Sequence, residues 1–194
     1  MQRQDKRRGD RDERVIIRPA RVEDSSSIAR VHVDSWRTTY RGIVPQAYLD
    51  GLSYGAREQW WREGLARVAD RSLGLFTLVA ESEAGQIVGF AGGGPVRHDH
   101  GDYRPFDGEL QAVYLLQQEQ GRGVGTQLVR EVAGLLRTDG RRSMMLWALE
   151  GNPACRFYGR LGGVVVFRRE VPVSGALLPE VAYGWPDIER LVAP

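Results

Sequence analysis

The chain has 194 residues, of which 42% are hydrophobic and 27% are charged, a composition typical of an ordinary globular protein. Its single cysteine, Cys155, cannot form an internal disulfide, which excludes a secreted scaffold built on disulfides. A net charge of +2 is too balanced to favour nucleic acid, and no segment approaches the roughly 20 apolar residues that a membrane span needs. We therefore expect a cytoplasmic protein with no nucleic acid and no membrane as partner.

The first fourteen residues differ from the rest of the chain. Apart from Met1 they contain no aliphatic or aromatic side chain, and most of them are charged, with both signs mixed. Such a segment cannot bury enough apolar surface to offset the entropy of ordering. The sequence therefore predicts a disordered, charged tail over 1–14 and a single domain over 15–194.

From Val15 onward, hydrophobic periodicity predicts strands interspersed with helices. In chain order we expect a strand near 15–17, a helix opening at 23–25, helical pieces after Pro45 and over 57–68, a hairpin of 75–80 with 87–92, a strand over 109–116, a helix over 123–137, a strand over 143–149, a short helix over 153–161, and strands at 164–167 and 181–185. This mixture predicts an α/β fold with one mixed sheet and helices on both sides.

A glycine-rich loop between the strand expected at 109–116 and the following helix is the most informative segment. It reads Gln120-Gly121-Arg122-Gly123-Val124-Gly125-Thr126. Glycines let the backbone approach a ligand, and free N–H groups at a helix N-terminus favour an anion, so the loop indicates a phosphate site. A tight connection without a ligand is the simpler alternative. Two familiar phosphate loops fail, because a P-loop needs a lysine and Lys6 is the only one, and a dinucleotide fingerprint needs a glycine where Thr126 stands.

The remaining pattern, Gln-x-x-Gly-x-Gly, resembles the loop with which GCN5-related N-acetyltransferases (GNAT) hold the pyrophosphate of acyl-coenzyme A. The resemblance covers about 15–185. It is carried, in order, by Arg18-Pro-Ala and Glu23-Asp24 before a helix, Trp36 and Tyr40 before Pro45, the hairpin ending near Val96, and Asn152-Pro-Ala-Cys-Arg-Phe-Tyr-Gly-Arg-Leu-Gly-Gly. It implies a GNAT-like α/β fold, with a mixed, mostly antiparallel central sheet flanked by helices on both sides.

The resemblance also implies acetyl-CoA as cosubstrate. The loop's backbone N–H groups would hold the pyrophosphate, and the backbones of Val113 and Leu115 would pair with the pantetheine arm as an added strand does. The residues carried over to coenzyme binding are Val113, Leu115, Gln120, Gly121, Arg122, Gly123, Val124, Gly125, Thr126 and Asn152. Asn152 is in addition a candidate N-cap of the short helix.

Two residues are candidates for the chemistry of acyl transfer, in which an amine loses a proton and the departing thiolate benefits from one. By resemblance Tyr158 is the general acid, although its position also suits an aromatic anchor beside Phe157. Glu109 lies four residues before Val113, so in a regularly alternating strand the two share a face. In some family members a glutamate at this offset is the general base, acting directly or through water; a solvated strand-end carboxylate is the alternative.

Other polar residues suggest less. Cys155 in the first turn of a helix has no activating histidine nearby in sequence, so we interpret it as buried filler rather than a nucleophile. His98-Asp99-His100 lacks further clustered ligands, so we expect an exposed turn and no metal site.

Together these residues predict an N-acetyltransferase that moves acetyl from acetyl-CoA to a primary amine by direct attack in a ternary complex. A non-catalytic acyl-CoA-binding sensor or interaction module is the alternative. The acceptor, a small-molecule or peptide amine, is left open among Trp36, Tyr40, Tyr48, Trp60, His98 and Trp185, and aromatic residues of the last strands suggest a possible homodimer.

Overall fold

The computed structural model describes residues 14–68, 73–97 and 105–192. The tail expected at 1–14 therefore lies almost wholly outside the described residues, as does the His98-Asp99-His100 turn.

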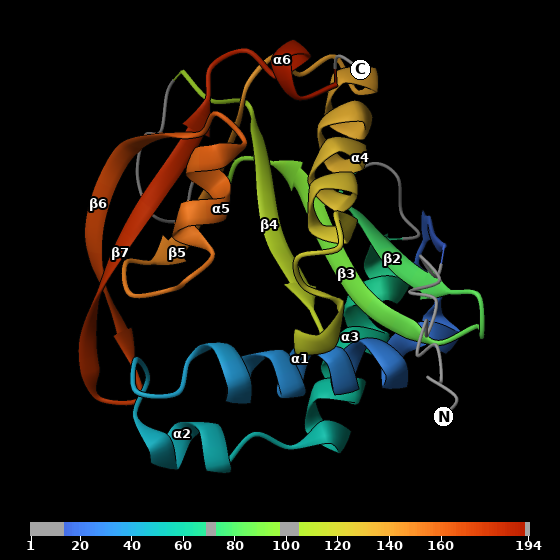
Figure 1. Cartoon of the computed structure of the whole chain (residues 1–194), viewed down its shortest axis with the longest axis vertical. Coiled ribbons are helices and arrows are strands. Elements are labelled where there is room, and N and C mark those ends of the chain that lie inside the picture. Colours follow the sequence, from blue (N-terminus) through green and yellow to red (C-terminus); the bar gives the residue numbers. More distant parts are fainter. Residues whose placement is uncertain (1–13, 69–72, 98–104, 193–194) are drawn as a thin grey trace, which may run out of the picture.

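A single seven-stranded sheet organises the described chain, with strand order β1-β2-β3-β4-β5-β7-β6 (Figure 1). All neighbouring strands are antiparallel except the parallel pair β4 and β5, which confirms the expected mixed, mostly antiparallel sheet. The strands are β1 (Val15–Pro19), β2 (Phe76–Ser82), β3 (Ile87–Pro95), β4 (Gly108–Leu115), β5 (Met144–Leu149), β6 (Val164–Val173) and β7 (Ala176–Trp185).

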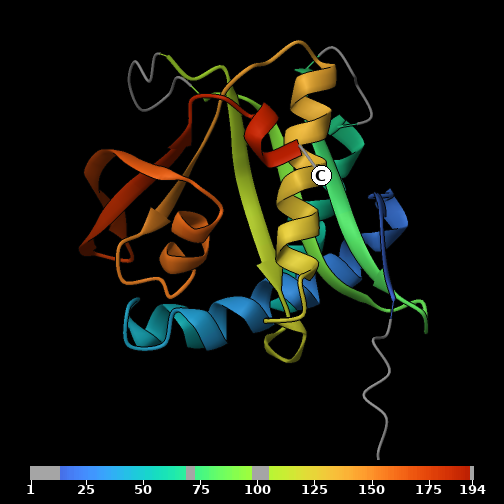
Figure 2. The ribbon, with the colours of Figure 1, turned by 45° about the horizontal axis from the view of Figure 1, so that its top comes forward.

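Helices cover both faces of the sheet (Figure 2). The cross-strand pair Phe90 and Tyr114 packs against His32 of α1, whereas Gly93 lies against Val132 of α4, so α1 and α4 occupy opposite faces. The helices are η1 (Val22–Asp24), α1 (Ser25–Thr39), α2 (Gln46–Asp50), α3 (Tyr54–Val68), η4 (Gln117–Glu119), α4 (Val124–Thr138), α5 (Cys155–Arg160) and α6 (Glu189–Val192).

Helix α4 forms because its apolar residues recur at helical spacing and bury one stripe against the sheet. Its buried residues are Val124, Leu128, Val129, Val132, Ala133 and Leu136, whereas Leu135, which lies off this stripe, is 37% exposed. Each fully buried large aliphatic side chain contributes about 1.5–3 kcal/mol relative to exposure. The stripe thus anchors the helix whose N-terminus follows the glycine loop.

The last two strands are longer than the sequence predicts. β6 and β7 have ten residues each and form a hairpin that is closed by Ser174 and Gly175. Both turn residues have positive φ (49° and 83°), as a type I′ turn requires. The predicted strands stop short because the outer half of the hairpin carries arginines and the prolines Pro172 and Pro179, which weaken a strand pattern.

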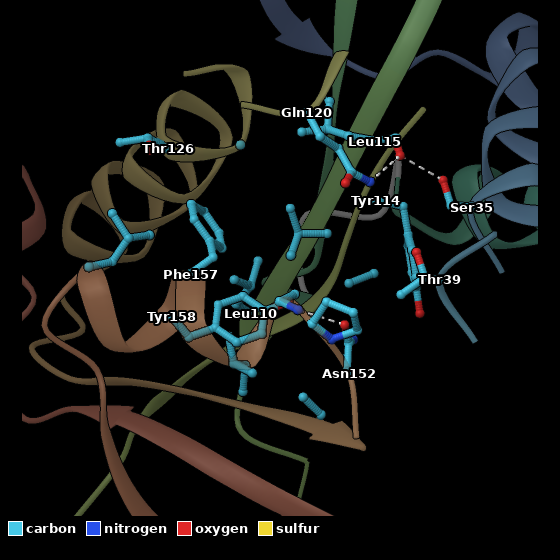
Figure 3. Close-up of a pocket in the computed structure, with 18 of the residues that line it drawn as sticks. Ser35, Thr39, Leu110, Tyr114, Leu115, Gln120, Thr126, Asn152, Phe157 and Tyr158 are labelled. Atoms are coloured by element: carbon cyan, nitrogen blue, oxygen red, sulfur yellow. Dashed lines mark hydrogen bonds between the residues drawn. The ribbon is translucent and has the colours of Figure 1, made fainter. Parts of the chain in front are cut away.

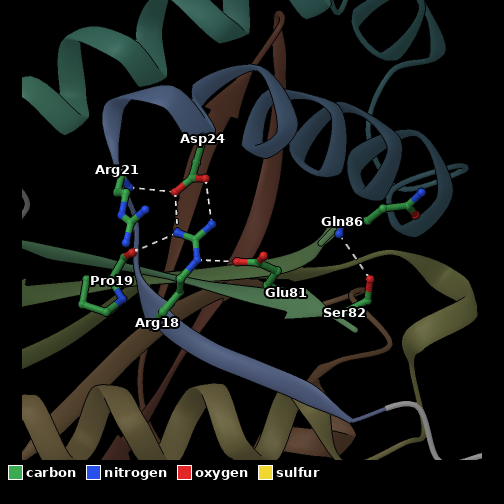
Figure 4. Close-up of polar contacts among 7 residues, drawn as sticks. All are labelled: Arg18, Pro19, Arg21, Asp24, Glu81, Ser82 and Gln86. Carbon is green, nitrogen blue, oxygen red and sulfur yellow. Dashed lines mark hydrogen bonds and ion pairs between the residues drawn. The ribbon is translucent and has the colours of Figure 1, made fainter. Parts of the chain in front are cut away.

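Arg18 of β1 links the segment before α1 to the neighbouring strand β2 (Figure 4). Its guanidinium donates to both carboxylate oxygens of Asp24, at 2.8 and 2.9 Å, and pairs with Glu81 of β2. The Arg21 N–H also donates to Asp24, at 2.8 Å. The Arg18 hydrogen bonds hold the pKa of Asp24 below its usual range. These contacts fix the short segment that leads from β1 into α1.

The parallel pair at the centre of the sheet separates almost at once. β4 and β5 pair only through Gly108 with Met144 and Glu109 with Met145. At this closed end Asp107 accepts hydrogen bonds from the Arg142 N–H at 3.0 Å, from the Ser143 N–H at 2.9 Å and from the Ser143 Oγ at 2.8 Å. Beyond it the inner edges of the two strands diverge.

Candidate active site

A cavity of about 650 Å³ opens where β4 and β5 diverge. In Figure 3, Phe157 and Tyr158 of α5 reach it from one side of β4, and Ser35, Thr39 and Tyr114 lie on the other. The glycine loop and the start of α4 close one end. The cavity therefore brings together most of the residues that the sequence assigns to coenzyme binding.

The glycine loop has the backbone geometry of an anion site. Gly121 and Gly123 have φ of 79° and 84°, and a Cβ at either would meet nothing within 4 Å. Gly123 is the N-cap of α4. The first hydrogen bond of the helix is donated by the Gln127 N–H to the Gly123 carbonyl, at 3.1 Å. The N–H groups of the preceding turn lack intrahelical acceptors. The loop thus offers open space and free donors to a pyrophosphate.

Gly125 and Arg122 have further contacts. A Cβ on Gly125 would lie 3.3 Å from Leu115 Cδ1 and 3.4 Å from a ring carbon of Phe157, so a glycine lets α4 pack closely against β4 and α5. Arg122 forms an ion pair with Glu119 at 3.0 Å, so its charge is already shared within the loop.

The free edge of β4 presents the backbones of Val113 and Leu115. The Leu116 N–H donates to Val88 of β3 at 3.0 Å, and the neighbouring backbone groups alternate in direction, so those of Leu115 and Val113 point away from β3. The Leu115 carbonyl accepts Ser35 Oγ at 3.0 Å and Gln120 Nε2 at 3.4 Å (Figure 3). The expected strand-like edge is therefore present, and one of its carbonyls already has two donors.

A bulge in β4 overturns the expectation that Glu109 and Val113 share a face. Gly93 pairs with Leu110 and Gly92 with Ala112, which leaves Gln111 as an extra residue. One inserted residue reverses the alternation of side chains, so Glu109 and Val113 lie on opposite faces. The predicted shared face was wrong because a bulge leaves no mark on the sequence pattern of a strand.

Glu109 is buried and tied to Arg97. Its side chain accepts the Arg97 backbone N–H at 2.9 Å and forms an ion pair with the guanidinium at 2.5 Å. Only 2% of the residue is exposed, and it is not among the residues that line the cavity. The structure therefore brings Tyr158, but not Glu109, to the cavity wall.

Tyr158 lines the cavity with an unengaged hydroxyl. The residue is buried, its ring packs against Phe157 and Tyr183 at 5.4 and 5.6 Å, and within the described chain its hydroxyl has no hydrogen-bond partner. Burial, and then the neighbouring Tyr114, raises the pKa of this phenol above its usual value. It therefore keeps its proton at neutral pH.

Asn152 caps the start of α5 with its side chain, as its position predicts. Its Oδ1 accepts the N–H of Ala154, two residues on, at 2.9 Å, although the regular α-helix begins only at Cys155. Asn152 Nδ2 donates to the Tyr40 hydroxyl at 3.2 Å. Asn152 also lines the cavity and links α5 to the end of α1.

The aromatic residues considered for the acceptor fall into different environments. Tyr40 lines the cavity, and the ring of Trp36 packs against it at a tilt, with 4.7 Å between the ring centroids. Trp60, half exposed, packs near His32 and away from the cavity lining. Trp185 is 3% exposed and its indole donates to the Leu161 carbonyl at 2.9 Å, so it belongs to the core.

His32 is held neutral inside an aromatic cluster. Trp61 Nε1 donates to His32 Nδ1 at 3.0 Å, and Tyr114 stacks on the imidazole at 5.0 Å. Burial, reinforced by Arg57, lowers the pKa of His32 to about 3. With Nδ1 accepting a bond, the remaining proton resides on Nε2.

Sequence reasoning missed several cavity residues. Ser35, Gln111, Trp147 and Arg160 line the cavity. Gln111 Nε2 is buried without a hydrogen-bond partner among the described residues. No local signal identifies these four, because the splitting of β4 from β5 and the docking of α1 bring them together.

Three further observations bear on function. Burial raises the pKa of the Cys155 thiol, whose Sγ lies 3.5 Å from the Leu149 carbonyl. Within 14–68, 73–97 and 105–192 no histidine, cysteine, aspartate and glutamate side chains gather into a metal-binding group. Over the same ranges, no helix has the length and hydropathy of a membrane span.

Comparison with known proteins agrees with this geometry. Residues 33–163 match the model of the acetyltransferase (GNAT) family, and the chain belongs to that family. It is an N-acetyltransferase that uses acetyl-CoA, which confirms the resemblance seen in the sequence.

Relatives extend the match over most of the chain. An uncharacterized N-acetyltransferase, YuaI of Bacillus subtilis, is 42% identical over 91% of this chain and 96% of its own length. An L-methionine sulfoximine/L-methionine sulfone acetyltransferase of Pseudomonas paraeruginosa is 31% identical over 71% of this chain and 73% of its own. The PaiA N-acetyltransferase of Thermoplasma acidophilum, solved with coenzyme A, has the same fold, with a TM-score of 0.64 and 22% identity over 86% of this chain and 98% of that one.

Proposed function

We propose that residues 15–194 form one catalytic domain in which a primary amine attacks acetyl-CoA directly, within a ternary complex. The observation that carries the proposal is the cavity, along which the glycine loop, the free edge of β4 and Tyr158 follow one another. This order suits a ligand whose pyrophosphate, pantetheine arm and thioester need an anion site, a strand edge and a proton donor. No residue of the chain needs to become acylated.

In this proposal the loop binds the coenzyme through its backbone. The N–H groups of Gly121, Arg122, Gly123, Val124, Gly125 and Thr126 hold the pyrophosphate, Val113 and Leu115 pair with the pantetheine arm, and Gln120 and Asn152 complete the site. The positive φ of Gly121 and Gly123 supports this assignment, because it turns the backbone toward open space. The ion pair of Arg122 with Glu119 favours a backbone role over a side-chain role for Arg122.

Tyr158 is proposed as the general acid that protonates the departing coenzyme A thiolate. Because burial raises its pKa, the phenol is protonated at neutral pH and has a proton to give. Its place on the cavity wall, with no hydrogen-bond partner among the described residues, supports the role by leaving that proton available to a ligand.

Glu109 is proposed as general base, acting through water rather than by contact, because its carboxylate is buried against Arg97 outside the cavity lining. With a verified acceptor, we expect Glu109→Gln to lower turnover about tenfold or more near neutral pH and less at higher pH, where the amine is already deprotonated. Glu131→Gln, at an exposed site on α4, is the matched control. A parallel loss at every pH would make Glu109 a structural partner of Arg97 instead.

The acceptor is proposed to be a small amine, handled in the cytoplasm. Support comes from the relative that acetylates methionine sulfoximine and methionine sulfone, both amino-acid-sized. A panel of amino-acid analogues, aminoglycosides and peptides, assayed for release of coenzyme A thiol, tests this class. Turnover confined to peptides would refute it.

Two remaining points have their own tests. A non-catalytic coenzyme-binding module would leave acetyl-CoA intact whether or not an amine is present, so amine-dependent thiol release distinguishes the enzyme from this alternative. A homodimer through the last strands is proposed from exposed Val164, Val165 and Leu177 on the β6–β7 hairpin. Sedimentation of the protein and of Leu177→Asp reports on it.

A further inference from the structure

Ser35 uses its hydroxyl in an unusual way. A serine inside a helix commonly donates to a carbonyl of its own preceding turn. Ser35 lies in α1, is 2% exposed, and donates instead across the cavity edge to the Leu115 carbonyl of β4, at 3.0 Å (Figure 3). A buried hydroxyl directed at the strand that meets the coenzyme has a consequence for what that strand can bind.

The Leu115 carbonyl is already engaged by protein donors, of which Ser35 Oγ is the closer, at 3.0 Å against 3.4 Å for Gln120 Nε2. A carbonyl oxygen has two lone pairs, and here Ser35 Oγ and Gln120 Nε2 both approach it. The Leu115 backbone faces the gap, so its N–H remains the group that this residue offers to a ligand. At Val113, by contrast, both the N–H and the carbonyl face the gap.

The free edge of β4 therefore offers different groups at its two positions: an N–H and a carbonyl at Val113, but only an N–H at Leu115. A pantetheine arm carries amide N–H and carbonyl groups spaced along an extended chain, much like a strand. If both carbonyls of the edge were free, the arm could pair in more than one register. Because the Leu115 carbonyl is occupied, an arm amide N–H finds no acceptor there, and an arm carbonyl is required instead. Unpaired polar groups in a buried contact are costly, so the alternative registers are disfavoured.

We propose that Ser35 is a positioning residue that sets the register of acetyl-CoA along β4, and thereby the place of the thioester beside Tyr158. The inference rests on the proposed coenzyme site. Ser35 touches no reacting atom in it. Its removal frees an acceptor at Leu115, lets the arm shift, and leaves the thioester misplaced in a fraction of complexes.

The test compares Ser35→Ala with the wild-type protein using two different acetyl donors. With acetyl-CoA, we expect Ser35→Ala to lower kcat about tenfold while the affinity for coenzyme A, measured by calorimetry, changes less than about threefold. With S-ethyl thioacetate, a thioester that lacks both amides of the arm and carries no amine of its own, the wild-type protein and Ser35→Ala should turn over equally slowly, because there is no arm register to set. Ser26→Ala, at an exposed serine of the same helix, is the control and should match the wild type with both donors.

A merely structural role would lower turnover equally with both donors, and that result would overturn the proposal. So would unchanged turnover with acetyl-CoA. If Ser35→Ala fails to fold, Ser35→Cys, which retains a weak donor, is expected to show a smaller loss confined to acetyl-CoA. On the unaltered protein, coenzyme A must slow amide hydrogen exchange at Leu115; unaltered exchange there contradicts the inference even when the enzyme is active.

Discussion

Replacing Tyr158 by phenylalanine isolates the proposed acid, because the change deletes one oxygen and little else. The ring contacts with Phe157 and Tyr183 are retained, and within the described chain the Tyr158 hydroxyl has no hydrogen-bond partner to lose. We therefore expect the free energy of unfolding to change by less than about 1 kcal/mol. Coenzyme A affinity should also be nearly unchanged.

The same substitution should lower turnover far more than it lowers stability. General acid catalysis contributes about 10²- to 10⁴-fold, which corresponds to about 2.7–5.5 kcal/mol in the activation barrier. That loss exceeds the expected stability change severalfold, so the two effects separate. It should also shrink with an aryl thioester donor, whose more acidic thiol leaves without needing a proton.

The assay is single-turnover transfer with saturating acetyl-CoA and a verified acceptor, which measures chemistry rather than product release. Because burial raises the pKa of Tyr158, its ionisation should not limit the wild-type rate at any pH below about 10. A folded Phe variant with full single-turnover rate would refute the acid role and make Tyr158 an aromatic anchor. An equal loss with both acetyl-CoA and the aryl thioester would refute it as well.

Three other outcomes follow from the geometry. Gly123→Ala places an L-residue at a φ of 84° and a methyl group where a phosphate would lie, so calorimetry should show coenzyme A affinity reduced about tenfold or more, whereas Gly134→Ala, in the interior of the same helix, should retain it. Asp24→Asn should lower the free energy of unfolding by about 2 kcal/mol at neutral pH. Since the pKa of Asp24 is depressed in the folded state, the stability that its carboxylate contributes is lost as pH falls. In denaturant titrations, the difference in stability between variant and wild type must therefore close below about pH 4. With a pKa of about 3, His32 should show no titration of its ring resonances by NMR between pH 5 and 8, and a midpoint near 6.5 would contradict its bond from Trp61.

The arrangement of the sheet and its helices follows from patterns that are local in sequence. The apolar stripe of α4, the β2–β3 hairpin and the glycine loop can each be identified from a segment of about 15 residues. Predictions fail where charged residues or prolines interrupt the apolar pattern of an element. The outer half of the β6–β7 hairpin carries Arg168, Arg169 and Pro172, and so was predicted too short.

The site is predictable only as far as its motifs are contiguous. The loop residues and Tyr158 belong to such motifs, and the structure brings them to one cavity. Ser35 and Leu115 are 80 positions apart in sequence, and nothing in either neighbourhood points to the other. The facing of Glu109 was predicted wrongly for a related reason, because the bulge at Gln111 is set by how β3 and β4 pair and has no signature of its own.

The hydrogen bonds of Asp107 lie at the narrow end of the wedge-shaped gap between β4 and β5, where the two strands are still paired. β4 and β5 diverge from that point, so a small rotation there becomes a larger displacement at the open end, where the loop and the arm would sit. Asp107 is not among the residues that line the cavity, yet its hydrogen bonds hold the two strands together at the end from which the cavity widens. Among relatives of this chain, differences in the acyl groups accommodated should be sought at this pivot as much as along the walls of the cavity.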